Sequence, residues 1–179
     1  MISRRRFVFI FGFIGMMLTI ALNACKRSLS VPASYGLTPD QFQLLESIHE
    51  HLFPSGPNKP GAKEIHSAAY VKKMLSDPQV KDYDKRLLLF GIQWTSETSQ
   101  TLFGKELLSL TSEEKEKVLL DLVSYENGEQ WISNNLTYIL EALLSDPVYG
   151  SNPNEIGWSW LKHQTGYPRP DNRTKYQYL

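Results

Sequence analysis

The segment 37–53 reads LTPDQFQLLESIHEHLF. Thr38 is a good N-cap residue, Pro39 suits the first helical position, and Gln41 follows the cap at the spacing of a capping box. Apolar residues then recur every three or four positions until the segment ends before Pro54. These residues are Phe42, Leu45, Ile48 and Leu52. The segment therefore predicts an amphipathic helix with a defined start and one apolar face turned toward a core.

Similar patterns recur downstream and predict four more helices. Ser55 to Gly61 is rich in turn formers and predicts a loop. Helices are expected over about 62–75 and 80–103, after the capping box that starts at Thr111, and over about 129–144. In the 80–103 helix the residues expected inside are Leu87, Leu88, Phe90, Gly91, Trp94 and Leu102. In the 129–144 helix they are Trp131, Ile132, Leu136, Ile139, Leu140 and Leu143.

Strands are not expected, because no stretch alternates apolar and polar residues with a period of two. Residues 145–179 are rich in turn formers and still carry aromatic side chains, among them Trp158 and Trp160. Such aromatics either pack over the core or are available to a partner, and the sequence leaves both readings open. The predicted fold is all-α, an irregular bundle of about five helices with a long aromatic-rich C-terminal loop region.

The first 25 residues have the layout of an export signal. Arg4 and Arg5 precede Phe7, which fits the Ser-Arg-Arg-x-Phe core of twin-arginine signals, and an apolar run continues to Ala24. Cys25 follows Leu-Asn-Ala and resembles the acylated cysteine of a bacterial lipobox. Two or three acyl chains hold a protein stably at a membrane surface. We therefore expect lipid attachment at Cys25 and a periplasm-facing protein in the bacterial envelope.

A second interpretation keeps the apolar run as an uncleaved anchor, with Cys25 as an inert thiol. Eighteen residues sit at the short edge of what spans ~30 Å of hydrocarbon. The lipoprotein interpretation is favoured because it explains the apolar run, the single cysteine and the polar tether together. It divides the chain into a signal peptide (1–24), a lipid-anchored tether (25–36) and a helical domain (37–179).

Composition excludes several other classes of protein. The 179 residues carry 19 basic and 19 acidic side chains, and 16 basic residues remain without the three arginines of the signal. This balance lacks the basic stripe that neutralises phosphates, so nucleic acid is not an expected partner. The single cysteine also excludes an intramolecular disulfide and a four-cysteine metal site.

Catalytic motifs are also missing. His49 and His51 stand two positions apart, where helical side chains point in very different directions, so we expect a solvated helix face rather than a metal site. His66 and His163 stand alone and are expected at the surface. The chain has no Cys-x-x-Cys-His and no Gly-x-Gly-x-x-Gly. We expect no catalytic, cofactor-binding or metal-binding residues in this chain.

Several segments in order resemble the gluconate 2-dehydrogenase subunit 3 family. They are 37–41, Phe53-Pro54 with 60–62, Phe103 with 110–113, and Asp146-Pro147-x-Tyr149-Gly150-x-Asn152 followed by Gly157-Trp158. Together they cover most of residues 37–168. The resemblance implies a non-catalytic small subunit that escorts, exports and anchors a large FAD-containing sugar or polyol dehydrogenase of the glucose-methanol-choline class. In many such complexes a cytochrome c subunit carrying haem c accepts the electrons.

The same resemblance points to the C-terminal loop as the partner contact. The residues expected there are Asp146, Pro147, Tyr149, Gly150, Asn152, Gly157, Trp158 and Trp160. Two alternatives remain at this stage. One is a free-standing periplasmic lipoprotein that binds a ligand through its aromatic tail, and the other is an enzyme in its own right.

Overall fold

The computed structural model describes residues 35–174, and these form a helical bundle without a strand. One isolated bridge joins Gly56 and Lys59, and most other backbone hydrogen bonds lie within helices and turns. The α-helices are α2 (Pro39–Leu52), α3 (Ser67–Ser76), α4 (Asp82–Phe103), α5 (Ser112–Val123), α6 (Glu126–Leu144) and α7 (Ile156–Leu161). Three short 3₁₀ turns join them: η1 (Leu107–Ser109), η2 (Pro147–Tyr149) and η3 (Pro153–Glu155). The all-α prediction is confirmed.

Helix starts follow the local sequence signals. At α2 the Thr38 amide donates to Gln41 Oε1 at 3.0 Å, and the Gln41 amide donates to Thr38 Oγ1 at 3.2 Å. The same reciprocal pair joins Thr111 and Glu114 at the start of α5. Each box satisfies two amide groups that have no partner inside the helix. Both predicted capping boxes are confirmed.

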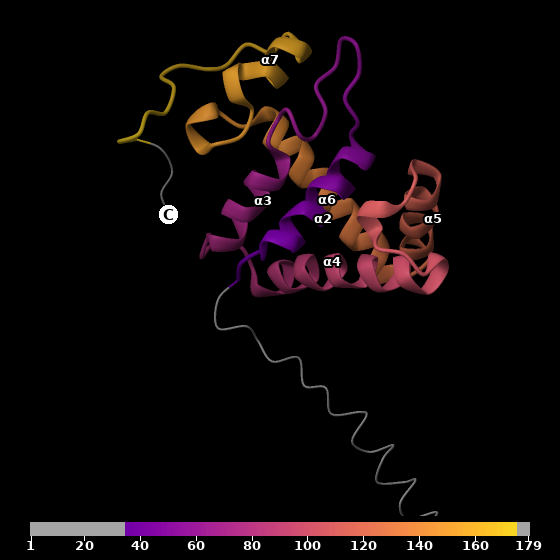
Figure 1. The fold of residues 1–179 in the computed structure, drawn as a ribbon. Coiled ribbons are helices and arrows are strands. Elements are labelled where there is room, and N and C mark those ends of the chain that lie inside the picture. Colours follow the sequence, from indigo (N-terminus) through magenta and orange to yellow (C-terminus); the bar gives the residue numbers. More distant parts are fainter. Residues whose placement is uncertain (1–34, 175–179) are drawn as a thin grey trace, which may run out of the picture. The chain divides into compact units, whose positions relative to one another are not determined.

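Helix α6 is the central element of the bundle. It packs against α2, α3, α4, α5 and α7, and Figure 1 shows it crossing behind α2 while α4 runs along one end and α7 lies at the other. The main core combines residues from α2 to α6 and includes Leu45, Ile48, Leu88, Ile92, Leu122 and Trp131. A smaller cluster of Ile65, Ile139, Ala142 and Leu143 lies between the α2–α3 loop and α7. The C-terminal segment packs against this second cluster through Ile156.

Helix α4 packs closely against a side chain of α6. A Cβ atom at Gly91 would lie 2.2 Å from the indole Nε1 of Trp131, so no side chain fits there. The indole nitrogen donates to the Leu88 carbonyl at 3.2 Å, which satisfies its hydrogen-bonding group inside the core. The close packing expected from a glycine inside a long helix is confirmed.

Some predictions of burial are wrong. Phe90 and Leu102 on α4, and Leu136 and Leu140 on α6, are exposed. Their spacing suits a buried helix, but within residues 35–174 no element covers these sides. The start of α3 also differs, because residues 62–66 form turns and His66 has a left-handed backbone with a φ of 58°. Helix α7 lies where only loop was expected.

No helix within the described range 35–174 is long and apolar enough to cross a bilayer. The predicted export residues Arg4, Arg5 and Phe7, and the predicted lipid attachment site Cys25, lie outside the described residues.

Candidate functional site

The C-terminal segment 146–160, predicted as a partner contact, is organised around the side chain of Asn152. Asn152 is fully buried, and its amide nitrogen Nδ2 donates to the Ser145 carbonyl at 3.0 Å. Its Oδ1 accepts from the Gly157 amide at 2.7 Å, while its own backbone amide donates to Ile65 O at 2.9 Å. The Asn152 side chain thus ties the end of α6 to the start of α7, and its backbone amide adds a bond to the loop before α3.

The backbone of α7 lies directly on α6. A Cβ atom at Gly157 would come within 2.3 Å of the Leu143 carbonyl oxygen, so only glycine permits this approach. The next residue, Trp158, is buried and donates from its indole Nε1 to Leu144 O at 2.8 Å. The carbonyl groups at the end of α6 have no partner inside their own helix, and α7 supplies one.

An ionic cluster covers the outside of this junction. Arg169 donates from Nε to Asp146 Oδ2 at 3.1 Å and from Nη1 to Glu155 Oε1 at 2.6 Å. Its guanidinium lies 5.0 Å from the ring centre of Trp158, close enough for a cation–π contact. Asp146 also accepts from the Val148 amide at 3.0 Å and so caps η2. Local sequence gave no signal for Arg169, because its partners are 14 and 23 residues away.

The remaining predicted residues lie nearer the surface. Tyr149 is half-buried, and Lys73 lies 4.8 Å from its ring centre. Gly150 is exposed, with a left-handed φ of 93° that glycine adopts easily. Trp160 is 37% exposed and packs edge-on against Phe53, with ring centres 6.0 Å apart. Most of the segment therefore packs inward, and its contact with a partner stays a prediction.

A second polar cluster lies deep in the bundle and is centred on His49 of α2. The imidazole Nε2 is 2.9 Å from Asn135 Oδ1 on α6, and Nδ1 is 2.8 Å from Ser67 Oγ on α3. Burial lowers the pKa of His49 to about 4, so the ring is neutral at pH 7. The prediction that His49 belongs to a solvated face is wrong, because the face at residues 45, 48 and 49 turns inward.

The proton positions in this cluster follow from its neighbours. Asn135 Nδ2 donates to Trp131 O at 2.8 Å, which fixes the amide so that Oδ1 faces the imidazole. A neutral His49 then donates from Nε2 to Asn135. The Ser67 hydroxyl has a single proton and two acceptors within reach, His49 Nδ1 at 2.8 Å and the Ala62 carbonyl at 3.0 Å. The cluster thus joins α2, α3 and α6 through buried side-chain hydrogen bonds.

Ser67, His49 and Asn135 resemble the composition of an acyl-transfer triad, but their burial does not suit that chemistry. Ser67 is 1% exposed and lies at the start of α3 beneath the loop. A nucleophile needs an open position where a substrate carbonyl can lie near both the hydroxyl and oxyanion donors. The arrangement of these three residues therefore favours a structural role.

His51, two positions on, turns away from His49 as expected. Its Nε2 lies 2.7 Å from Glu116 Oε2 on α5. Among residues 35–174, no group of three or more His, Cys, Asp or Glu side chains could hold a metal ion. His66 and His163 are exposed, as predicted.

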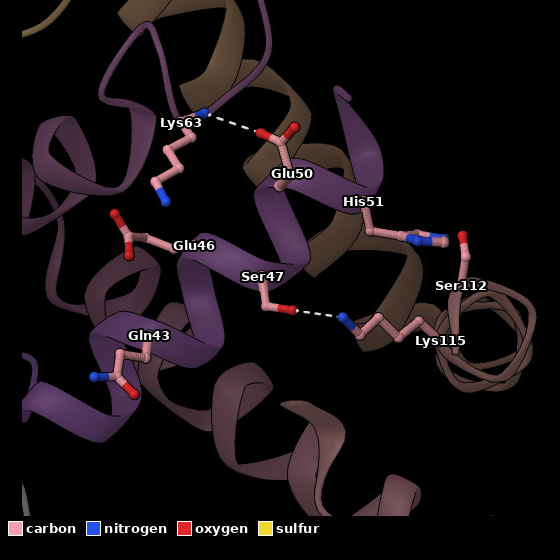
Figure 2. A pocket seen from close by; sticks show the side chains of 8 residues that line it. All are labelled: Gln43, Glu46, Ser47, Glu50, His51, Lys63, Ser112 and Lys115. Carbon is pink, nitrogen blue, oxygen red and sulfur yellow. Dashed lines mark hydrogen bonds between the residues drawn. The ribbon is translucent and has the colours of Figure 1, made fainter. Parts of the chain in front are cut away.

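A surface groove of about 420 Å³ lies between α2, the loop before α3 and the start of α5. Figure 2 shows its lining: Gln43, Glu46, Ser47, Glu50, His51, Lys63, Ser112 and Lys115. Four of these side chains already have partners. Lys115 Nζ donates to Ser47 Oγ at 2.9 Å, Glu50 accepts from the Lys63 amide at 3.1 Å, and His51 pairs with Glu116. Acidic and basic groups are mixed, so the groove favours no ligand charge.

Comparison with known proteins gives one match. A family model described as gluconate 2-dehydrogenase subunit 3 matches residues 39–166, which run from the start of α2 to beyond α7. No curated protein and no solved structure matches the chain significantly. The matched region contains the His49 cluster, the groove and the whole of segment 146–160.

Proposed function

The chain belongs to the gluconate 2-dehydrogenase subunit 3 family, and we propose that it is the non-catalytic small subunit of a dehydrogenase complex. The family match over residues 39–166 carries this proposal, since members of the family are accessory subunits of such complexes.

The proposed partner is a large FAD-containing dehydrogenase of the glucose-methanol-choline class that oxidises a sugar or polyol, with a cytochrome c subunit as electron acceptor. The FAD would belong to that partner and haem c to the cytochrome. Within residues 35–174 the groove has mixed charge and partly paired walls, and it offers no phosphate-binding glycine turn. The small subunit would contribute binding surface rather than cofactor ligands.

Escort and membrane attachment complete the proposal. Twin-arginine signals direct proteins that are already folded, so a partner without a signal of its own could leave the cytoplasm bound to this chain. Arg4, Arg5 and Phe7 supply the signal pattern, and Cys25 supplies the proposed lipid attachment site. After export, acyl chains on Cys25 would hold the complex at the periplasmic surface of a membrane.

The test is a pull-down of the tagged full-length protein from detergent-solubilised native membranes. Mass spectrometry identifies the proteins that copurify, and a visible absorption spectrum reports bound flavin and haem. We expect a flavoprotein in a fixed ratio to this chain, with the absorption band of oxidised flavin. Recovery of the chain alone, or with a small ligand and no flavoprotein, would contradict the proposal and favour a free-standing lipoprotein.

A further inference from the structure

Helix α6 presents an apolar face to solvent in addition to the face it buries. Leu136, Leu140 and Leu144 are 42%, 54% and 48% exposed. Their spacing of four residues places them in one row along a helix. Ser133 and Thr137 lie on the same side, and no residue from 130 to 140 is charged. We call the row Leu136, Leu140 and Leu144 the leucine face.

The leucine face lies on a helix that already packs against five other helices. Its other side contacts five helices and buries Trp131, Asn135 and Ile139. A surface helix normally carries polar residues opposite its buried stripe, whereas a helix that is apolar all round is a buried one. The row of three leucines on the outer side of α6 departs from that polar pattern, and residues 35–174 leave it about half exposed.

We infer that the leucine face of α6 is the surface on which the catalytic chain of the dehydrogenase complex docks. This inference rests on the proposed function, because membership of a subunit family supplies the second chain. Helix-in-groove recognition uses anchors at this spacing. The occupant is therefore an apolar groove on the large subunit.

The charged residues of α6 indicate what kind of partner groove would be complementary. The only charged residues of α6 are Glu126, Glu129 and Glu141, and all three are acidic and exposed. Glu126 and Glu129 precede the uncharged stretch 130–140, and Glu141 follows it. A complementary partner surface has basic residues at its rim, whereas the anionic headgroups of a bacterial membrane would be repelled. This argues for a protein partner over a lipid surface.

The face continues toward the C-terminal segment. Leu144 is the last residue of α6, and its carbonyl oxygen accepts from Trp158 of α7. Helix α7 then exposes Trp160 and Leu161. Aromatic anchors of this kind are common at the centres of interfaces. The Asn152 and Gly157 contacts hold α7 against the end of α6 and so fix the place of α7 and its two exposed apolar residues.

The experiment measures the dissociation constant of the complete complex, purified with its flavoprotein from cells that express both chains. Leu140→Glu places a charge in the middle of the face. We expect it to raise the dissociation constant at least ~30-fold, the effect of losing a hot spot. Leu120→Glu is the matched control, because Leu120 on α5 is 58% exposed and lies off the face. It should change the constant by less than ~3-fold, within about 0.6 kcal/mol.

Two further measurements separate docking from folding and from other occupants. Leu140→Met keeps the apolar contact and should bind like the wild type. Circular dichroism should show the same helix content in both glutamate variants. The inference is overturned if Leu140→Glu leaves the flavoprotein bound. It is also overturned if Leu140→Glu only splits a homodimer, or only weakens binding to phosphatidylglycerol vesicles. If the wild type retains no flavoprotein, the proposed function itself fails.

Discussion

Acidification should destabilise this domain through one residue, His49. The imidazole is fully buried and neutral, with Ser67 and Asn135 on its two nitrogens. In the unfolded chain it takes up a proton near its ordinary pKa of 6.5, whereas in the folded protein burial lowers the pKa to about 4. Between these values the unfolded state binds more protons, so the free energy of unfolding falls as pH falls.

The size of the effect follows from the two pKa values. Each unit of difference corresponds to 1.36 kcal/mol, so full passage from pH 6.5 to pH 4 costs about 3 kcal/mol. The stability that neutral His49 contributes is fully present above pH 6.5, and no further stability is lost through this residue below pH 4. A loss of this size is a large part of the stability of an ordinary domain.

Urea unfolding of a fragment that spans 35–179, a compact unit by itself, measures this effect. Tryptophan fluorescence reports the transition from pH 7.5 to pH 4. His49→Gln serves as the reference, because glutamine retains polar groups and does not titrate. Carboxylates titrate in both proteins, so the difference between their free energies of unfolding isolates His49. If the wild type loses no more stability than His49→Gln over this range, the inference of a neutral buried imidazole is refuted.

Three further predictions concern packing, the C-terminal segment and export. Gly91→Ala should lower the free energy of unfolding by about 1–3 kcal/mol in urea titrations, because the new Cβ overlaps Trp131 and outweighs the gain in helix propensity. Asn152→Ala should lower it by about 3 kcal/mol, because it leaves two buried backbone groups unpaired, and proteolysis should cut the segment after α6 first. Replacing Arg4 and Arg5 with lysine should leave both this chain and its flavoprotein in the cytoplasmic fraction, and normal export of either would contradict the escort role.

Local signals were sufficient for the helix starts and for the α4–α6 crossing. A capping box involves residues only three positions apart. A glycine inside a long helix indicates that another element packs closely against it. Both features can therefore be predicted from local sequence. The His49 cluster could not be predicted in this way. Its partners lie 18 and 86 residues away, and the sequence His49-Glu50-His51 resembles a solvated face.

Helix α7 was missed for a related reason. It has six residues, too few for periodicity to show, and it follows two residues with left-handed backbones, Asn154 and Glu155. A helix of that length has little stability alone, so its formation depends on the contacts of Gly157 and Trp158 with α6. Those contacts are tertiary, and a single sequence does not contain them.

The positions that revealed the family and the surface proposed for docking are different sets of residues. Asn152, Gly157 and Trp158 carry the resemblance, and they are buried in the junction that holds α7 on α6. Such residues specify how the C-terminal segment folds, and any chain with this junction would need them whatever its partner. Leu136 and Leu140 belong to no motif, and their exposure contradicts their helical pattern. The proposed docking surface therefore rests on exposed leucines in a helical pattern and not on the motif residues, which are buried.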